Sequence, residues 1–133
     1  MNCTGTINGL WWYRTTQDTG TNTATIWRNG TIIAETTTNP ATTGWTLATF
    51  TTPINVTTGD KLIVGIHHPN GAYANRVNGF TNRSVVSPTG CMTAPLSQTT
   101  AKNGLYAYSQ TRTLPTLSYA DTEYFITPNF TRA

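Results

Sequence analysis

The stretch that decides the fold runs from Gly44 to Ala74 and reads GWTLATFTTPINVTTGDKLIVGIHHPNGAYA. Side chains alternate between two faces over residues 45–50, which is the period-2 pattern of a half-buried β-strand. Pro53 has no amide hydrogen to donate to a sheet, so it favours an edge strand or a bend at residues 54–56. The first half of the stretch therefore predicts a strand close to an edge.

The second half of the stretch predicts a turn, a strand and a functional loop. Thr57-Thr58-Gly59-Asp60 is a tight turn, because Gly59 tolerates positive φ and Asp60 can bond to its own backbone. Residues 61–66 are apolar enough for a strand that is buried on both faces. The next residues, His67 to Tyr73, cannot continue a sheet, since they contain Pro69 and an Asn-Gly turn. A core strand that ends in a polar, aromatic loop is typical of a binding site on a rigid scaffold.

The rest of the chain predicts an all-β fold. The 133 residues are 10% charged and 37% hydrophobic, and they are rich in threonine, which suits strands. No window repeats with a helical period, so we expect one domain over residues 1–133, an antiparallel β-sandwich or jelly roll of about eight strands. Asn29-Gly30 is the strongest hairpin signal. Outside the central stretch, the expected strands are Thr6–Arg14, Thr23–Arg28, Thr31–Thr37, Gly104–Ser109 and Glu123–Phe130, and residues 74–103 are expected to be irregular.

Charge and hydropathy limit the partners and the compartment. The net charge of +3 is scattered, which excludes a basic nucleic-acid surface, and no 18-residue apolar run exists to span a membrane. Polar residues follow Met1 at once, so no signal peptide is expected in this chain. The charge-poor surface favours a protein that works outside cells. A virion surface or an extracellular location satisfies both observations.

The two cysteines, Cys3 and Cys91, are far apart in the sequence. They could form one disulfide or remain free thiols, and the sequence alone leaves both open. A disulfide between them would close a long loop and add roughly 4 kcal/mol to stability in the chain-entropy model.

Several segments resemble one family. They are GLWWYR, TGTNTATIWRNGTIIAETT, TGWTLATFTTPINVTTGDKLIVGIHHPNGAYA, NGLYAYS and LPTLSYADTEYF, which together span roughly residues 5–130. In this order they resemble an uncharacterised bacterial β-sandwich module, a domain of unknown function found beside carbohydrate-active enzymes, fibronectin-like repeats and surface adhesins. The most specific block is His-x-Pro-Asn-Gly-x-Tyr at residues 67–73. The resemblance implies a β-sandwich and an accessory role, without a ligand.

The chain departs from the family pattern in three places. The family usually has a strand before the GLWWYR-like segment, where this chain has only residues 1–4. Trp11 stands where such sequences usually have a polar residue, so its indole is expected to face outward. Pro128 interrupts the last strand. If a strand is missing, an unpaired edge remains, and we expect another chain to cover it, with Trp11 in or near the contact.

Catalytic and metal-binding patterns are weak. Asp121 and Glu123 have the spacing to share a strand face, but a loop cap and a solvated strand start explain them better than a glycosidase pair. His67 and His68 are adjacent, so they would point to opposite faces of a strand. We therefore expect no catalytic residue, metal or cofactor, and we read His67 as a residue that fixes the Pro-Asn-Gly turn.

Aromatic residues carry the functional argument. Sugar rings stack on aromatic faces while Asn and His exchange hydrogen bonds with hydroxyl groups. The predicted ligand-binding residues are His67, Asn70, Tyr73, Asn103, Tyr106 and Tyr108, with Tyr119 as a further turn aromatic. Trp11 and Tyr13 are the predicted interface residues. Core packing explains Trp12, Trp27, Trp45 and Phe50.

Three function classes follow from these observations. The first hypothesis is a non-enzymatic accessory protein of a phage virion, a capsid decoration or tail component, that binds cell-surface or environmental carbohydrate. It would also contact other virion proteins or a second copy of itself. The alternative is a carbohydrate-binding or adhesion module of a larger secreted bacterial protein. A glycoside hydrolase is the weakest alternative.

Overall fold

A computed structural model describes residues 1–133 and shows ten β-strands and no helix, so no helix could cross a membrane. Six strands build two sheets: β1 (Gly5–Arg14), β2 (Asn22–Arg28), β3 (Thr31–Thr38), β4 (Gly44–Val56), β5 (Ile63–His67) and β10 (Ile126–Arg132). The other four have two residues each: β6 (Val85–Val86), β7 (Thr93–Ala94), β8 (Leu105–Tyr106) and β9 (Leu117–Ser118). The predicted all-β fold is confirmed.

Two three-stranded antiparallel sheets form the sandwich. One has the strand order β10-β1-β4 and the other β3-β2-β5. Their facing sides enclose a core of eight buried residues, namely Ile7, Leu10, Trp12, Ala24, Ile26, Ala48, Phe50 and Val56. This burial of apolar surface is the main force that holds the sheets together.

Strand β1 shows how the sequence pattern selects the buried face. Leu10 and Trp12 enter the core, while Trp11 and Tyr13 point to the outer side of the sheet. The register against β4 shifts between Ile7 and Gly9, so both Ile7 and Leu10 reach the core. Such a bulge inserts an extra residue and re-aims the side chains that follow it. The outward orientation expected for Trp11 is therefore observed.

The hairpin between β2 and β3 forms where Asn29-Gly30 predicts it. Asn29 has φ 52° and Gly30 has φ 77°, which matches the two left-handed positions of a type I′ turn. The predicted strand bounds agree with the observed ones within one residue on this hairpin.

Some expectations for the strands were wrong. Trp45 was assigned to the core but is 54% exposed, because the buried face of β4 carries the small Thr46 and Ala48 instead. Strand β5 is half-buried along its whole length, because it is an edge strand of its sheet. The strand expected at residues 104–109 is reduced to β8, and the last strand begins three residues later than expected.

The expectation of a vacant position beside β1 was also wrong. Strand β1 is central in its sheet, with β4 on one side and β10 on the other. Pro128 lies in β10, an edge strand, where a missing amide donor is tolerated. The residues before β1 are held as well, since the amino group of Met1 donates to the carbonyl of Asp60 at 2.6 Å.

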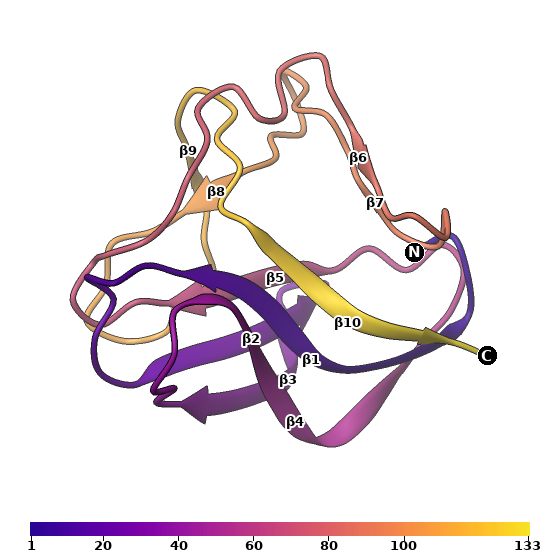
Figure 1. The fold of residues 1–133 in the computed structure, drawn as a ribbon. Helices are drawn as coiled ribbons and strands as arrows, with labels where there is room; N and C mark the ends of the chain where they lie inside the picture. The colour runs from indigo at the N-terminus through magenta and orange to yellow at the C-terminus, as the bar shows by residue number, and fades with distance from the viewer.

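Residues 74–125, which we call the loop layer, cover one end of the sandwich (Figure 1). Here β6 pairs with β7 and β8 pairs with β9, and the remaining residues are irregular apart from one bridge between Arg76 and Glu123. Phe80 is buried, and the Arg76 guanidinium bonds to the Glu123 carboxylate at 2.5 Å. The loop layer is thus held by individual side-chain contacts and not by long paired strands.

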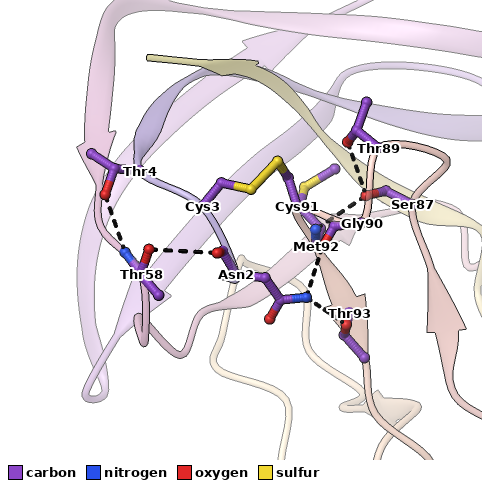
Figure 2. Close-up of a disulfide and its surroundings, with 10 residues drawn as sticks. All are labelled: Asn2, Cys3, Thr4, Thr58, Ser87, Thr89, Gly90, Cys91, Met92 and Thr93. Atoms are coloured by element: carbon purple, nitrogen blue, oxygen red, sulfur yellow. Dashed lines mark hydrogen bonds between the residues drawn. A yellow bond between two sulfur atoms is a disulfide. The ribbon is translucent and has the colours of Figure 1, made fainter.

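A disulfide joins the loop layer to the start of β1. Cys3 and Cys91 are bonded, which resolves the alternative left open by the sequence, and Cys91 is fully buried. Figure 2 shows the surrounding bonds: the Asn2 side chain donates to the carbonyl of Gly90 and to the hydroxyl of Thr93, both at 2.9 Å. The disulfide therefore sits within a local network that ties the N-terminus to the β6–β7 hairpin.

Candidate functional site

One hollow of the molecule, which we call the basin, has a volume of about 320 Å³ and lies beside β5. One side is built from β5 with Thr25 and Trp27 of β2, and the other side from residues 105–113 of the loop layer. The basin thus forms where a sheet edge meets the loop layer, and its volume is typical of a small-ligand site.

Gly65 shapes the sheet side of the basin. A Cβ atom at this position would lie 3.1 Å from the ring of Trp27, so the missing side chain lets the indole pack against β5. Trp27 was assigned to the core, and it is indeed buried, yet its ring also lines the basin.

His67 joins the two sides of the basin. Its Nε2 lies 2.9 Å from the carbonyl oxygen of Ser109, a residue of the opposite side. The expected role in fixing the Pro-Asn-Gly turn was wrong, because that turn is closed by the Gly71 amide, which donates to the carbonyl of His68 at 3.0 Å. His67 therefore sets the width of the basin.

His68 anchors the other end of the same loop. Its Nδ1 lies 2.8 Å from a carboxylate oxygen of Asp18, which is fully buried, and the buried Asn22 amide donates to both Asp18 oxygens at 3.0 Å. Burial lowers the pKa of His68 below its ordinary value, although the Asp18 carboxylate opposes the shift. This network fastens the loop at residues 67–73 to the loop at residues 15–22.

Arg112 is a lining residue of the basin whose charge is already compensated. Its Nε donates to the Glu35 carboxylate of β3 at 2.5 Å, and the Thr25 hydroxyl donates to the same carboxylate at 2.9 Å. Burial would raise the pKa of Glu35, but the bonds from Arg112 and Thr25 outweigh it and lower the pKa. The ion pair clamps the loop layer onto the sheet without leaving a free charge.

A second hollow of about 310 Å³ adjoins the basin, and its lining consists of five tyrosines. We call it the tyrosine cup: Tyr73, Tyr106, Tyr108, Tyr119 and Tyr124. All of these except Tyr119 also line the basin, so the two hollows are continuous. Burial, followed by the influence of Tyr73, raises the pKa of the Tyr124 hydroxyl above its ordinary value.

The structure brings four of the six predicted ligand-binding residues together and leaves two apart. His67, Tyr73, Tyr106 and Tyr108 line the basin. Asn70 lies outside the lining, and its amide donates to the carbonyl of Gln17 at 2.5 Å and to the Thr19 hydroxyl at 3.1 Å. Asn103 also lies outside, with its amide on the carbonyl of Pro95 at 2.7 Å. Both asparagines hold loops in place.

The predicted interface residues, Trp11 and Tyr13, lie on the outer face of the β10-β1-β4 sheet, which points away from the core. Tyr13 is 42% exposed and stands across from Trp45 on β4, with ring centroids 5.9 Å apart in an edge-to-face arrangement. Trp11 is half-buried and stands across from Leu47. We call these four side chains the outer aromatic face.

Sequence reasoning missed two lining residues, Tyr124 and Arg112. Tyr124 fell in the last expected strand and in the family-like segment LPTLSYADTEYF, but neither it nor Arg112 was named as a site residue. The available signal was the number of tyrosines in the last third of the chain. Only the tertiary structure, in which Arg112 and Tyr124 line the same hollow as β5, assigns them to the site.

Carboxylates are absent from the lining of both hollows. Asp121 accepts from the Thr81 hydroxyl at 2.8 Å and pairs with Lys102, while Glu123 pairs with Arg76. Hydrogen bonds from Thr81 and Ser97 lower the pKa of Asp121. The structure also contains no group of three or more His, Cys, Asp or Glu side chains that could hold a metal ion.

Comparison with known families assigns the chain. A family model described as "Domain of unknown function (DUF4082)" matches residues 1–126, which is most of the chain. The chain belongs to this family. No curated protein and no solved structure matches it. The expected membership in a domain-of-unknown-function family is confirmed, and the basin is therefore interpreted from its own geometry.

Proposed function

We propose that this protein is a non-enzymatic carbohydrate-binding module that holds a glycan in the basin. The observation that carries the proposal is the lining itself, where aromatic rings stand beside uncharged hydrogen-bonding groups. Tyr73, Tyr106 and Trp27 offer ring faces, and Ser109 and Gln110 offer donors and acceptors. Sugars present apolar C–H faces and hydroxyl groups, so they match such a lining.

The charge of the basin favours a neutral glycan. Arg112 is already paired with Glu35, so an acidic sugar would have to displace a carboxylate that is bound at 2.5 Å. Hydrolysis would require two carboxyl groups on either side of a sugar bond, and the lining offers none. These two features support binding rather than catalysis.

The disulfide supports an extracellular setting. Disulfides persist in oxidising compartments and are rare in the bacterial cytoplasm. Cys3–Cys91 therefore favours an adhesion or carbohydrate-binding module that works outside the cell. In that setting the module would attach a larger protein or an assembly to a glycan surface.

The outer aromatic face favours a second candidate, an accessory protein of a phage virion. Trp45 and Tyr13 are exposed on a sheet face, and neither of them lines the basin. Exposed aromatics of this kind are enriched at protein interfaces. A capsid decoration or tail component would use this face to dock on another virion protein and would leave the basin free for glycan.

A glycan array followed by calorimetry tests the proposal. The wild-type protein should bind neutral glycans, and Tyr106→Leu should weaken binding about tenfold, since the loss of one stacking ring costs about 1.4 kcal/mol. Trp45→Leu is the matched control, because it removes an aromatic ring outside the basin. Failure to bind any glycan, or an equal loss in both variants, would refute the proposal.

A further inference from the structure

The tyrosine cup has a composition that differs from the rest of the basin. Its lining consists of tyrosines alone, whereas the basin also contains aliphatic residues, hydroxyl groups, histidines and Arg112. Tyr106 and Tyr124 are half-buried, Tyr73 is exposed, and Tyr108 and Tyr119 form the most exposed rim at 82% and 67% exposure. The cup is thus a concave surface built from aromatic rings.

Neighbouring rings of the cup are steeply inclined to one another. Tyr73 and Tyr124 have centroids 5.6 Å apart and planes inclined by 67°. Tyr106 and Tyr108 have centroids 5.4 Å apart and planes inclined by 64°. Rings inclined in this way form an angled surface and not one flat plane. This geometry suits a compact, rounded group.

The electrostatics of the cup favour a cation. The face of each aromatic ring is negative, so a hollow lined by five aromatic rings attracts positive charge. None of the nearby basic side chains lines the cup: Arg112 pairs with Glu35, Lys102 with Asp121, and the Arg76 guanidinium lies 6.0 Å from the Phe125 ring. No cationic side chain of the protein therefore occupies the cup.

The same lining selects the type of cation. No carboxylate lines the cup, so a metal ion or a primary ammonium group would lose its water shell without gaining an ion pair. A quaternary ammonium group has no N–H to satisfy and is weakly hydrated, and aromatic cages recognise such groups.

We propose that the tyrosine cup binds a quaternary ammonium group of the choline type. This site goes beyond glycan recognition, since choline needs no sugar to occupy it. Choline occurs as a substituent of cell-surface polymers and as a lipid headgroup, and both sources share the trimethylammonium group. In the first case the basin would hold the sugar and the adjoining cup its substituent.

Titration with choline and its neutral isostere tests the site. Choline should bind the wild-type protein at least tenfold more tightly than 3,3-dimethyl-1-butanol, which has the same shape without the charge, as followed by calorimetry or tyrosine fluorescence. The double variant Tyr108→Leu/Tyr119→Leu should lose at least tenfold in choline affinity. These rim residues are exposed, so the fold should survive. Tyr13→Leu, outside the cup, is the matched control.

Two further experiments distinguish a polymer-bound choline from a lipid headgroup, and the choline proposal from the carbohydrate proposal. If the protein binds soluble phosphocholine but does not co-sediment with phosphatidylcholine vesicles, the choline group belongs to a polymer substituent. If the protein co-sediments with phosphatidylcholine vesicles but not with phosphatidylglycerol vesicles, the choline group belongs to a lipid. Equal affinity for choline and its isostere, absence of choline binding, or an unchanged double variant overturns the inference. Because the glycan array can be read with choline-free glycans, a failure here leaves the carbohydrate proposal standing, and the reverse also holds.

Discussion

The sandwich and the loop layer are stabilised in different ways. The sandwich has long paired strands around a continuous apolar core, with Trp12 and Ile26 fully buried. The loop layer has only two-residue strands and is held at separate points by a disulfide, ion pairs and one buried ring, Phe80. The basin lies where the two regions meet, and the tyrosine cup is lined by Tyr73 and four tyrosines of the loop layer. The comparison teaches that the scaffold and the site depend on different interactions, so they can be perturbed separately.

Trp12→Ala should have the largest effect, because it removes a large side chain from the sandwich core. Truncation of a buried Trp costs about 3–5 kcal/mol. Urea unfolding should show this loss as a single cooperative transition. Phe80→Ala is the matched change in the loop layer, and it should instead increase amide exchange over residues 74–125 while the sheet signal in circular dichroism persists. Identical exchange patterns in the two variants would contradict the division into two regions.

Removal of the disulfide should have the next largest effect. The bond closes a loop between positions 88 residues apart, and its loss costs about 2–5 kcal/mol. The double variant Cys3→Ala/Cys91→Ala should therefore unfold at lower urea concentration and should expose the β6–β7 hairpin to protease. The wild-type protein without reductant is the reference. An unchanged urea midpoint would show that the hydrogen bonds of Asn2 suffice to hold this corner.

Gly104→Ala should break the site more than the scaffold. Gly104 has φ 75°, and a Cβ atom there would overlap the backbone carbonyl oxygen of Thr122. The backbone strain alone costs about 1–3 kcal/mol, and the overlap should push Tyr106 away from Tyr124. We expect a lower melting temperature, altered near-ultraviolet circular dichroism of tyrosine and weaker ligand binding.

Gly90→Ala is the matched control for this prediction. Gly90 has a similar φ of 72°, but no atom lies within 4 Å of the position that a Cβ would take. It should therefore show the cost of the backbone strain without the overlap. Equal losses in the two variants would mean that contact with Thr122 does not matter.

Acidification should have the smallest effect and should act through His68. Its pKa is lowered in the folded state, so below the ordinary value of 6.5 the unfolded chain binds more protons than the folded chain. The stability from this group is complete above about pH 6.5 and is lost as the pH falls toward the lower, folded pKa. Melting temperatures between pH 7.5 and pH 5 should fall less steeply in His68→Gln. An unchanged slope in His68→Gln would assign the effect to another group.

The sequence predicted the candidate site in part. His67, Tyr73, Tyr106 and Tyr108 were found because turn residues and aromatics mark a loop that leaves a strand. Asn70 and Asn103 carried the same signals but serve the loops themselves, because an asparagine side chain can bond to nearby backbone as readily as to a ligand. Sequence patterns do not distinguish these two uses.

By itself, the sequence determined the class of fold, the strands of the first half and the Asn29-Gly30 hairpin. These features depend on residues one or two positions apart, where alternation and backbone preference act directly. Only the tertiary structure decided that β10 lies beside β1, that Cys3 reaches Cys91, and that Trp45 faces outward. It also decided that Tyr124 and Arg112 meet β5. Such contacts join distant residues, and they are selected by the packing of the whole chain, which no local pattern contains.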